Sequence, residues 1–455
     1  MGRSRTLGAA GLVAAVALVA AVVFAPAADA VSPDPNPWLQ KRFLVMAHQG
    51  GEDEAPSNTM FALKSAIQDR GADSLELDVN LSADGQLMVI HDDTWTRIAC
   101  TDALCPGPSS STEQVRPASQ VRNKTAAELQ ALDAGYWFRP GTYSHDYTLP
   151  DSAYPYRGMR TGAVPPPTGY TASDFVIPTL QQVLNQFPNI PINVEIKMIK
   201  TLNNDTSTGS GCTGSPPNRY CDDPDASIPV ADTLAELLNN EPESIRKNII
   251  VVSFSDELLA EFHKMDDTPN VALAGATNGT TAFALAGTQP DPDVAAFQVP
   301  PNQTVSGQDI KVPELLLTTQ KAHCLGYAVH IWTNGDQDET PAGYERFYNS
   351  GADGVMTSKP SQLRAWLDDH GISAPDGKNP LTWPVECPVP PPSGPAQNPQ
   401  QAPTPKPSCK KGKHRKKGIC VPKKCRKHKV RSGRRCVVPK NWKARHRSAG
   451  PAVRG

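Results

Sequence analysis

The sequence predicts an α/β fold, a closed (β/α)8 TIM barrel, on three observations. Short apolar runs of the strand type alternate with segments whose apolar residues recur at helical spacing between residues 43 and 370. Eight such runs occur, which is the number of strands that a closed parallel barrel requires. Acidic residues and histidines gather where several runs end, and that end of a barrel carries its functional site.

The eight predicted strands are short apolar runs separated by helical segments and loops. They begin near Phe43, Ser74, Ile192, Ile249, Val271, Val294, Tyr327 and Gly354. Helices are predicted over 59–67, 179–187, 231–238, 256–264, 313–323 and 360–369, with Thr179 as an N-cap. Segments 91–125 and 138–175 are predicted to be loops that shape access to the site, although long polar insertions are also simply tolerated.

The second predicted strand places two carboxylates on one face. Side chains alternate along a strand, so Glu76 and Asp78 point one way and the apolar residues between them point the other way. If helices cover the apolar face, the carboxylates face the barrel interior, where buried charge is costly unless something positive binds there. A bound metal ion is therefore predicted. An antiparallel strand with a wet outer face is the commoner meaning of such an alternation by itself.

Two histidines flank this strand in the sequence. His48 ends the first apolar run, and His91 follows a turn at Asp84-Gly85 and a short apolar run over 87–90. Both are therefore predicted at strand ends, near the two carboxylates.

A series of short motifs follows in a fixed order. They are His48-x-Gly50, Asn58-Thr59, Glu76-x-Asp78, Asp84-Gly85, His91-Asp92, the segment 125–138, Ile177-Pro-Thr-Leu180, Glu195-x-Lys197, Trp332-Thr-Asn334 and Gly351-Ala-Asp-Gly354. Their order resembles the glycerophosphodiester phosphodiesterase family, and the resemblance implies the same barrel fold. This chain departs from the family pattern at two positions, because the family usually has Arg where Gln49 stands and Glu where Ser57 stands.

Three carboxylates are predicted to form the metal site. Glu195 and Lys197 repeat the i, i+2 spacing of Glu76 and Asp78, so both can face inward from their strand. Glu76, Asp78 and Glu195 offer only hard oxygen donors, which favours Ca²⁺ or Mg²⁺ over zinc or copper. For Glu195 and Lys197 alone, an internal ion pair is an equally good interpretation.

The same residues predict phosphodiester chemistry. A divalent ion would polarise a phosphoryl oxygen, and Lys197 would add a second positive contact. His48 and His91 would act as acid and base on opposite sides of an in-line displacement, and the sequence leaves open which does which. Gln49 and Trp332 are predicted to contact the substrate. Because Gln49 offers only a neutral hydrogen bond, phosphate affinity should fall or the substrate should present its charge differently.

The N-terminal sequence predicts export. Residues 1–30 carry two arginines, an apolar run over 7–24 and a final Ala28-Asp29-Ala30, which is the pattern of a signal peptide cleaved after Ala30. An uncleaved membrane anchor is the alternative. The protein is therefore expected to be secreted or associated with the cell wall.

An exported chain with ten cysteines predicts disulfides. Within the predicted barrel domain, residues 31–387 with a core over 43–370, the expected pairs are Cys100 with Cys105, Cys212 with Cys221, and Cys324 with Cys387. Zinc is the alternative for close pairs, but C-x4-C and C-x8-C lack the usual tight spacing.

The composition changes after Cys387. Residues 388–408 are a Pro-rich linker, and residues 409–455 are a tail that contains a repeat. In this repeat Cys409 with Cys420, and Cys425 with Cys436, are each expected to close a small hairpin. Residues 388–455 hold 20 Lys and Arg and no Asp or Glu, whereas residues 31–387 hold 23 against 45, a net charge of −22.

The basic tail predicts binding to an anionic cell-wall polymer or a membrane surface. A solvated, partly disordered tail that docks weakly on the acidic barrel is the alternative. Nucleic acid is not expected as a partner, because Trp442 is the only aromatic residue of the tail.

Together with the export signal and the predicted metal site, the family resemblance implies an exported, metal-dependent enzyme that hydrolyses small or lipid-derived glycerophosphodiesters to glycerol phosphate and an alcohol. A phospholipase D-like enzyme acting on lysophospholipid or sphingolipid head groups is the nearest alternative. A protein of another class, catalytically weak and binding polyanions or cell wall through its tail, is the third. Gln49 favours the third interpretation, and the intact set of histidines and carboxylates opposes it.

Overall fold

The computed structural model describes residues 36–39, 42–99, 112–141, 149–207, 211–265, 271–288, 290, 293–305, 307–319 and 322–372, and four short strands between 413 and 437. Contacts divide the chain into two units, Met1–Pro388 and Val389–Gly455, and each is described by itself. The predicted signal peptide and Pro-rich linker lie outside the described residues, as do Cys100, Cys105, Cys387, Cys409 and Cys425.

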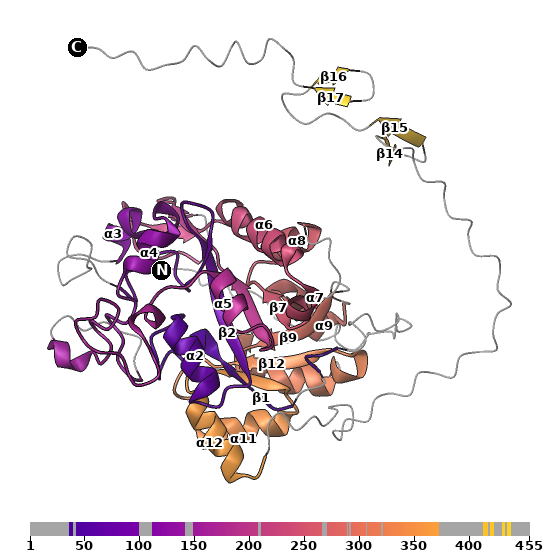
Figure 1. Cartoon of the computed structure of the whole chain (residues 1–455). Coiled ribbons are helices and arrows are strands. Elements are labelled where there is room, and N and C mark those ends of the chain that lie inside the picture. Colours follow the sequence, from indigo (N-terminus) through magenta and orange to yellow (C-terminus); the bar gives the residue numbers. More distant parts are fainter. Residues whose placement is uncertain are drawn as a thin grey trace, which may run out of the picture. The chain divides into compact units, whose positions relative to one another are not determined.

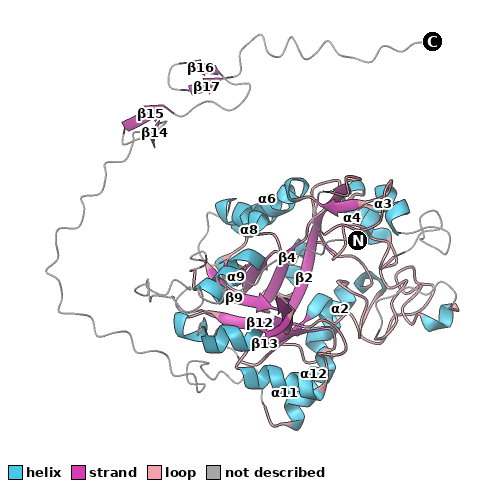
Figure 2. Ribbon diagram, turned by 180° about the vertical axis from the view of Figure 1, so that it is seen from behind, coloured by secondary structure: helices cyan, strands magenta, loops and turns pink. Residues whose placement is uncertain are grey.

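Eight parallel strands close into a barrel (Figures 1 and 2). They are β1 (Leu44–Ala47), β2 (Ser74–Leu81), β4 (Ile192–Ile196), β7 (Ile249–Val252), β8 (Ala272–Gly275), β9 (Val294–Val299), β12 (Ala328–Trp332) and β13 (Gly354–Thr357). Each strand pairs with the next in this order, and β1 pairs with both β13 and β2, which closes the ring. The predicted (β/α)8 fold is confirmed, and each predicted strand corresponds to one strand of the barrel.

Short additional strands extend from the barrel. The strand β3 (Leu87–Val89) runs antiparallel to the far end of β2. Two hairpins follow later strands: β5 (Lys200–Leu202) with β6 (Tyr220–Asp222), and β10 (Asn302–Val305) with β11 (Gln308–Lys311).

Helices cover the outside of the barrel (Figure 1). They are α2 (Met60–Gln68), α5 (Leu180–Gln186), α6 (Pro224–Asn240), α7 (Glu243–Arg246), α8 (Asp256–Met265), α9 (Thr277–Ala286), α10 (Val312–Glu314), α11 (Pro341–Ser350) and α12 (Pro360–Asp369). Thr179 caps α5 as predicted, because its hydroxyl accepts a hydrogen bond from the Gln182 backbone N–H.

The single helix predicted over 313–323 is wrong, because the segment forms several short helical turns of different types. The segment 313–323 is not continuous, because α10 passes into a π-helical turn at Leu315–Thr319 and the chain then forms a 3₁₀ turn at Ala322–Leu325. Thr318 and Thr319 are consecutive β-branched residues, which are poor helix formers, and this accounts for the lost regularity.

Apolar side chains form two layers that match the alternation along the strands. Leu75, Leu77 and Val79 belong to the cluster between barrel and helices. Leu44 and Met46 belong to a second cluster that fills the interior. Burying side chains of this size is worth about 1.5–3 kcal/mol each, so the alternation fixes which face of each strand points inward.

The two segments predicted as loops contain more structure than expected. The first includes α3 (Thr112–Ser119), and α4 (Ala126–Ala131) follows it. Trp95, Val121 and Leu129 form a small core there. In the second, Tyr156 and Tyr170 pack on Phe61 of α2. Apolar residues spaced without helical or strand periodicity gave no sequence signal for these small cores.

The disulfide pattern is borne out where it can be seen. Cys212 and Cys221 are bonded to each other, and Cys221 lies on β6 of the β5–β6 hairpin. Cys324 is also in a disulfide, and its expected partner, Cys387, lies outside the described residues.

The second unit contains two antiparallel hairpins. They are β14 (Lys413–Lys416) with β15 (Ile419–Pro422), and β16 (Val430–Ser432) with β17 (Arg435–Val437). Arg415 stands opposite Cys420 in the first and Arg431 opposite Cys436 in the second, so the sequence repeat has the same register in both.

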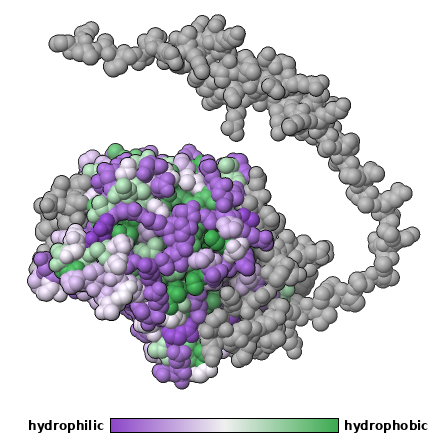
Figure 3. Space-filling view, in the orientation of Figure 1, coloured by the Kyte–Doolittle hydropathy of each residue, from purple (hydrophilic) through white to green (hydrophobic). Residues whose placement is uncertain are grey.

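Polar residues cover most of the described surface on the face shown in Figure 3. Among the helices that the structure describes, none combines the length and the apolar character that crossing a membrane requires.

Candidate active site

Three carboxylates meet inside the barrel. Glu76 and Asp78 lie on β2 and Glu195 lies on the adjacent β4, where it stands directly opposite Asp78. One carboxylate oxygen of each lies within 4.8 Å of the others. Glu76 and Asp78 are buried, and Glu195 keeps 9% of its surface exposed. The structure thus brings together the three residues that were predicted to bind metal.

This acidic cluster fits a divalent cation. Asp78 Oδ2 accepts a hydrogen bond from Asn58 Nδ2 at 2.8 Å, whereas its Oδ1 is buried without a hydrogen-bond partner among the described residues. Glu76 Oε2 accepts from the Gln49 backbone N–H at 2.9 Å. Each of these carboxylates is anchored through one oxygen, and hard oxygen donors suit Ca²⁺ or Mg²⁺.

The cluster shifts the pKa values of its members in opposite directions. Burial raises the pKa of Glu76, and the nearby charges of Asp78 and Glu195 raise it further. Burial by itself would also raise the pKa of Asp78, but His91 and Lys197 hold it below its ordinary value. The site therefore favours the ionised form of Asp78 and disfavours the ionised form of Glu76. A bound cation would stabilise the ionised form of Glu76.

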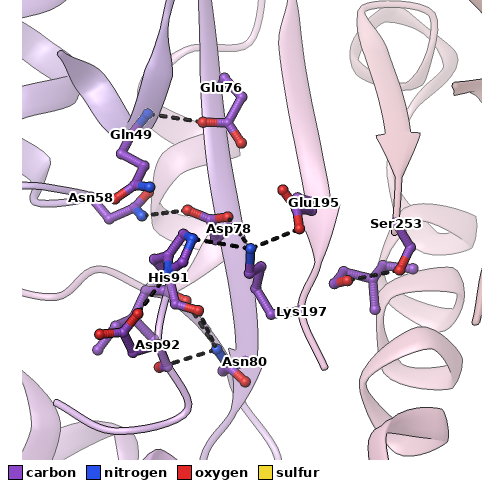
Figure 4. Close-up of polar contacts among 12 residues, drawn as sticks. Gln49, Asn58, Glu76, Asp78, Asn80, His91, Asp92, Glu195, Lys197 and Ser253 are labelled. Atoms are coloured by element: carbon purple, nitrogen blue, oxygen red, sulfur yellow. Dashed lines mark hydrogen bonds and ion pairs between the residues drawn. The ribbon is translucent and has the colours of Figure 1, made fainter. Parts of the chain in front are cut away.

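Lys197 lies between the cluster and His91 (Figure 4). Its Nζ is 2.7 Å from Glu195 Oε1 and 3.5 Å from Asp78 Oδ1. Burial alone would lower the pKa of Lys197, but these carboxylates hold it above its ordinary value. The ion pair considered for Glu195 and Lys197 is therefore present, within the same site as the three carboxylates.

His48 follows β1 and contacts two carboxylates. Its Nδ1 hydrogen-bonds Glu52 Oε1, and its Nε2 is 3.8 Å from Glu76 Oε2. Burial would lower the pKa of His48, but these carboxylates raise it to about 10. Gly50 in the following turn has φ +81°, and a Cβ there would meet Ala62 at 2.8 Å, so the turn requires glycine.

His91 follows β3 and lies on the opposite side of Asp78 from Glu76 in Figure 4. Its Nδ1 lies 2.6 Å from Asp92 Oδ1, and its Nε2 lies 3.1 Å from Lys197 Nζ. Burial would raise the pKa of Asp92, but the charges of Arg97 and His91 keep it well below its usual range. Both histidines are thus oriented by a carboxylate at Nδ1, which leaves both Nε2 atoms facing the site.

Three residues of the site were not predicted from the sequence. Glu52 contacts His48, Arg97 contacts Asp92 at 2.8 Å, and Phe254 lies at the end of β7. The only advance signals were the i, i+4 spacing of His48 and Glu52 and the position of Phe254 directly after a strand.

A sequence model of the Glycerophosphoryl diester phosphodiesterase family matches residues 48–211, the segment that supplies both histidines, all three carboxylates and Lys197. This segment of the chain carries the sequence pattern of that family, and curated family members match it as well.

Curated members of the family match parts of the chain. A glycerophosphodiester phosphodiesterase of Caldanaerobacter subterraneus is 38% identical over 95 residues, 21% of this chain and 32% of the relative. One of Bacillus altitudinis is 47% identical over 94 residues, 21% of this chain and 31% of the relative. Lysophospholipase D GDPD1 of Homo sapiens is 24% identical over 355 residues, 74% of this chain and 89% of the relative. The chain thus spans about a third of the length of the first two.

Two solved glycerophosphodiester phosphodiesterase-like structures are also similar. The enzyme of Agrobacterium tumefaciens is 20% identical with a TM-score of 0.43, covering 71% of this chain and 99% of that one. A phosphodiesterase of Oleispira antarctica, in complex with the product sn-glycerol-3-phosphate, is 19% identical with a TM-score of 0.43, covering 71% of this chain and 96% of that one.

Aromatic residues border the candidate site. Trp332, a predicted substrate contact at the end of β12, meets Phe254 edge to face with 5.8 Å between ring centroids. Phe254 is 49% exposed, and Lys197 Nζ lies 5.9 Å from its ring centroid. The two rings therefore form an apolar wall beside the charged groups.

Proposed function

We propose that this protein is a metal-dependent phosphodiesterase that hydrolyses glycerophosphodiesters to glycerol phosphate and an alcohol. One observation carries the proposal. His48 and His91, each hydrogen-bonded at Nδ1 to its own carboxylate, present their Nε2 atoms to the region of Glu76, Asp78 and Glu195. Two histidines on either side of an oxygen-donor metal site are the groups that an in-line displacement at phosphorus needs.

Each group has a distinct part in the reaction. A cation held by Glu76, Asp78 and Glu195 would supply Lewis-acid stabilisation of the charge that develops on the phosphoryl oxygens. Lys197 adds a second positive charge 3.5 Å from Asp78. His91 takes a proton from the attacking hydroxyl or water, and His48 gives a proton to the leaving alcohol oxygen. The Phe254–Trp332 wall is placed to contact apolar parts of the substrate.

The experiment is an incubation of the mature protein with a panel of glycerophosphodiesters, lysophospholipids and glycerol phosphate polymers, with Mg²⁺, with Ca²⁺ and with EDTA. The proposal requires glycerol phosphate and free alcohol as products, and their loss in EDTA. A double variant, His48→Ala with His91→Ala, serves as the control for contaminating activity. No product from any diester, with metal present, overturns the proposal in favour of a binding protein.

A lysophospholipase D activity is the second candidate. The similarity to Lysophospholipase D GDPD1 over 74% of the chain supports it, and the same histidines and carboxylates would perform it. The two candidates differ in the diester that is consumed: release of lysophosphatidic acid from a lysophospholipid, without turnover of water-soluble diesters, would favour the second.

The tail is proposed to tether the enzyme to an anionic cell-wall polymer or membrane surface after export through the predicted signal peptide. Residues 388–455 carry 20 basic and no acidic residues, and two hairpins of matching register repeat within them. Many weak charge contacts from such repeats favour an extended anionic surface. N-terminal sequencing of protein recovered from the culture medium or wall would test cleavage after Ala30.

A further inference from the structure

The two positions at which the chain departs from the family pattern contact each other. Ser57 Oγ donates a hydrogen bond to Gln49 Oε1. Gln49 is completely buried and Ser57 is 6% exposed. The exchange of an arginine and a glutamate for Gln49 and Ser57 is therefore one local arrangement, not two separate losses.

Hydrogen bonds fix the backbone and the side-chain oxygen of Gln49, but its side-chain Nε2 donor has no partner among the described residues. Its backbone N–H donates to Glu76, and its carbonyl oxygen accepts from the Asn58 N–H at 2.8 Å. The side-chain Nε2 is buried without a hydrogen-bond partner among the described residues. In Figure 4 the Gln49 amide lies beside Asn58, on the same side of β2 as His91. A buried amide donor is costly unless a ligand accepts its hydrogen bond.

Arg97 connects the surroundings of the two histidines. Its Nη2 donates to Gln49 Oε1 at 3.4 Å, next to His48 in the sequence, and its Nε donates to Asp92 Oδ2 at 2.8 Å, next to His91. A phosphoryl group transferred in line must lie between the two histidines. Arg97 contacts a sequence neighbour of each histidine, and a guanidinium suits the planar pair of oxygens that a phosphodiester presents.

The charge of the site also points to Arg97. Carboxylates of Glu76, Asp78, Glu195, Glu52 and Asp92 surround the histidines. A neutral Gln49 contributes nothing to offset them, whereas Arg97 brings a permanent positive charge to Gln49 itself.

We propose that Gln49 and Arg97 together form the phosphoryl-binding edge of the site. Gln49 Nε2 donates to a non-bridging phosphoryl oxygen, and Arg97 supplies the positive charge. Ser57 and Asp92 hold the two in place. The ligand is a phosphodiester monoanion or the phosphate group of its product. The identity of this ligand rests on the proposed function, whereas the test measures phosphate binding and requires no turnover.

The test is calorimetric titration of inorganic phosphate into the full-length protein with Mg²⁺ present. Arg97→Gln and Gln49→Met should each weaken phosphate binding by about tenfold to a hundredfold, as expected for the loss of a hydrogen bond to a charged group. Arg346→Gln is the matched control, because Arg346 is also paired with a carboxylate, Glu314, at 2.9 Å, but on the outer helix layer. It should leave binding unchanged.

A competing role predicts a different result. If Arg97 only orients Asp92 and His91, Arg97→Gln lowers kcat while phosphate affinity and KM stay as in the wild type, and the proposal is overturned. Absence of phosphate binding to the wild type overturns it as well. Because phosphate binding needs no turnover, the titration stays interpretable even where no diester is hydrolysed and the proposed function fails.

A second, independent test moves the positive side chain from one position of the site to the other. In the Arg97→Gln background, Gln49→Arg with Ser57→Glu moves the cation from position 97 to position 49. This triple variant should recover most of the lost phosphate affinity if both positions serve one ligand. A folded triple variant, verified by its melting temperature, that binds phosphate no better than Arg97→Gln would refute the shared site.

Discussion

The Nε2 atom of His91 lies 3.1 Å from the Nζ atom of Lys197, whose ammonium group can only donate a hydrogen bond. In the neutral form of the His91 ring, Nε2 is therefore the atom that carries the lone pair, and the ring proton is on Nδ1, facing Asp92. His48 differs, because a carboxylate lies near each of its ring nitrogens. Under the proposed function, His91 accepts a proton and His48 gives one, which is the pairing that acid–base catalysis requires.

The first prediction separates these two roles. His48→Ala should lower kcat by about 100-fold to 10,000-fold on an alkyl diester, whose leaving alcohol needs a proton, but much less on a nitrophenyl diester, whose leaving group does not. His91→Ala should slow both substrates alike. His263→Ala, a histidine paired with Asp293 on the outer helices, is the control. The reverse pattern between the two substrates would exchange the roles of the histidines.

The second prediction concerns the metal. Glu76→Gln, Asp78→Asn and Glu195→Gln should each lower bound metal and activity together, and excess Mg²⁺ or Ca²⁺ should restore part of the rate, because each variant removes one of the three proposed ligands. Metal content by elemental analysis is the direct measurement. Asp222→Asn, which removes a carboxylate paired with Lys200, is the matched control. Full activity of metal-free protein in chelator would disprove a metal role.

The third prediction concerns Glu52. Glu52→Gln keeps the shape of the side chain but removes a negative charge from His48 Nδ1. The pKa of His48, about 10 with Glu52 present, should fall, and kcat should fall at least about tenfold through loss of the positioned proton donor. An NMR titration of the His48 ring in metal-free protein measures the shift, with Glu54→Gln as control. An unchanged His48 titration would show that Glu52 does not act on it.

The fourth prediction concerns stability at low pH. His330 on β12 is buried in the barrel, its ring lies edge-on to Trp38, and neither ring nitrogen has a hydrogen-bond partner among the described residues. Burial lowers the pKa of His330 to about 4, against the opposing effect of Asp353, and His323 adds to the lowering. Between pH 6.5 and 4 the unfolded chain therefore binds a proton that the folded chain does not.

The free energy of unfolding should fall as the pH drops through this window, by about 3 kcal/mol at most from His330 alone. His330→Leu should remove this part of the acid sensitivity. Denaturant unfolding at pH 7 and pH 4 measures it, and the surface variant His263→Ala should behave as the wild type. An equal acid-dependent loss of stability in His330→Leu and the wild type would contradict the assignment.

Most of the barrel could be predicted because its strands are apolar runs of a length that helices rarely match. The helices were harder to predict from the sequence than the strands. The helix α9 begins with Thr277 and includes Gly279, which are poor helix formers, and it is stabilised by packing of Phe283 on Phe297, 4.5 Å between ring centroids. Phe297 lies on the following strand, β9, so no pattern within the helix reveals that contact.

In the candidate site, too, residues on regular strands could be predicted, whereas residues on loops could not. Asp78 and Glu195 could be placed together because strand alternation and parallel pairing fix their faces, and the register puts them directly opposite. Glu52 and Arg97 could not, because their positions depend on irregular backbone. Glu52 follows Gly51, which has φ +85°, and Arg97 lies in the loop after β3. Side chains on loops reach the site through turns that single-sequence patterns do not specify.

The last prediction concerns the tail. Truncation before Pro388 removes 20 basic residues and no acidic ones, together with both hairpins of the second unit. Hydrolysis of a small soluble diester should stay nearly unchanged, because all the residues of the active site lie within residues 48–332. Retention on isolated anionic cell walls or anionic vesicles should be lost.

Salt provides the control for this experiment. Contacts between exposed charges are screened over about 8 Å at physiological ionic strength, so binding of the full-length protein should fall steeply as salt rises while its activity on the soluble diester does not. Sedimentation with walls or vesicles at several salt concentrations measures retention, and neutral vesicles should retain neither form. If the truncated protein still sediments with anionic surfaces, the barrel unit itself binds them. If truncation instead abolishes turnover of the soluble diester, the tail is part of the catalytic machinery and not a separate tether.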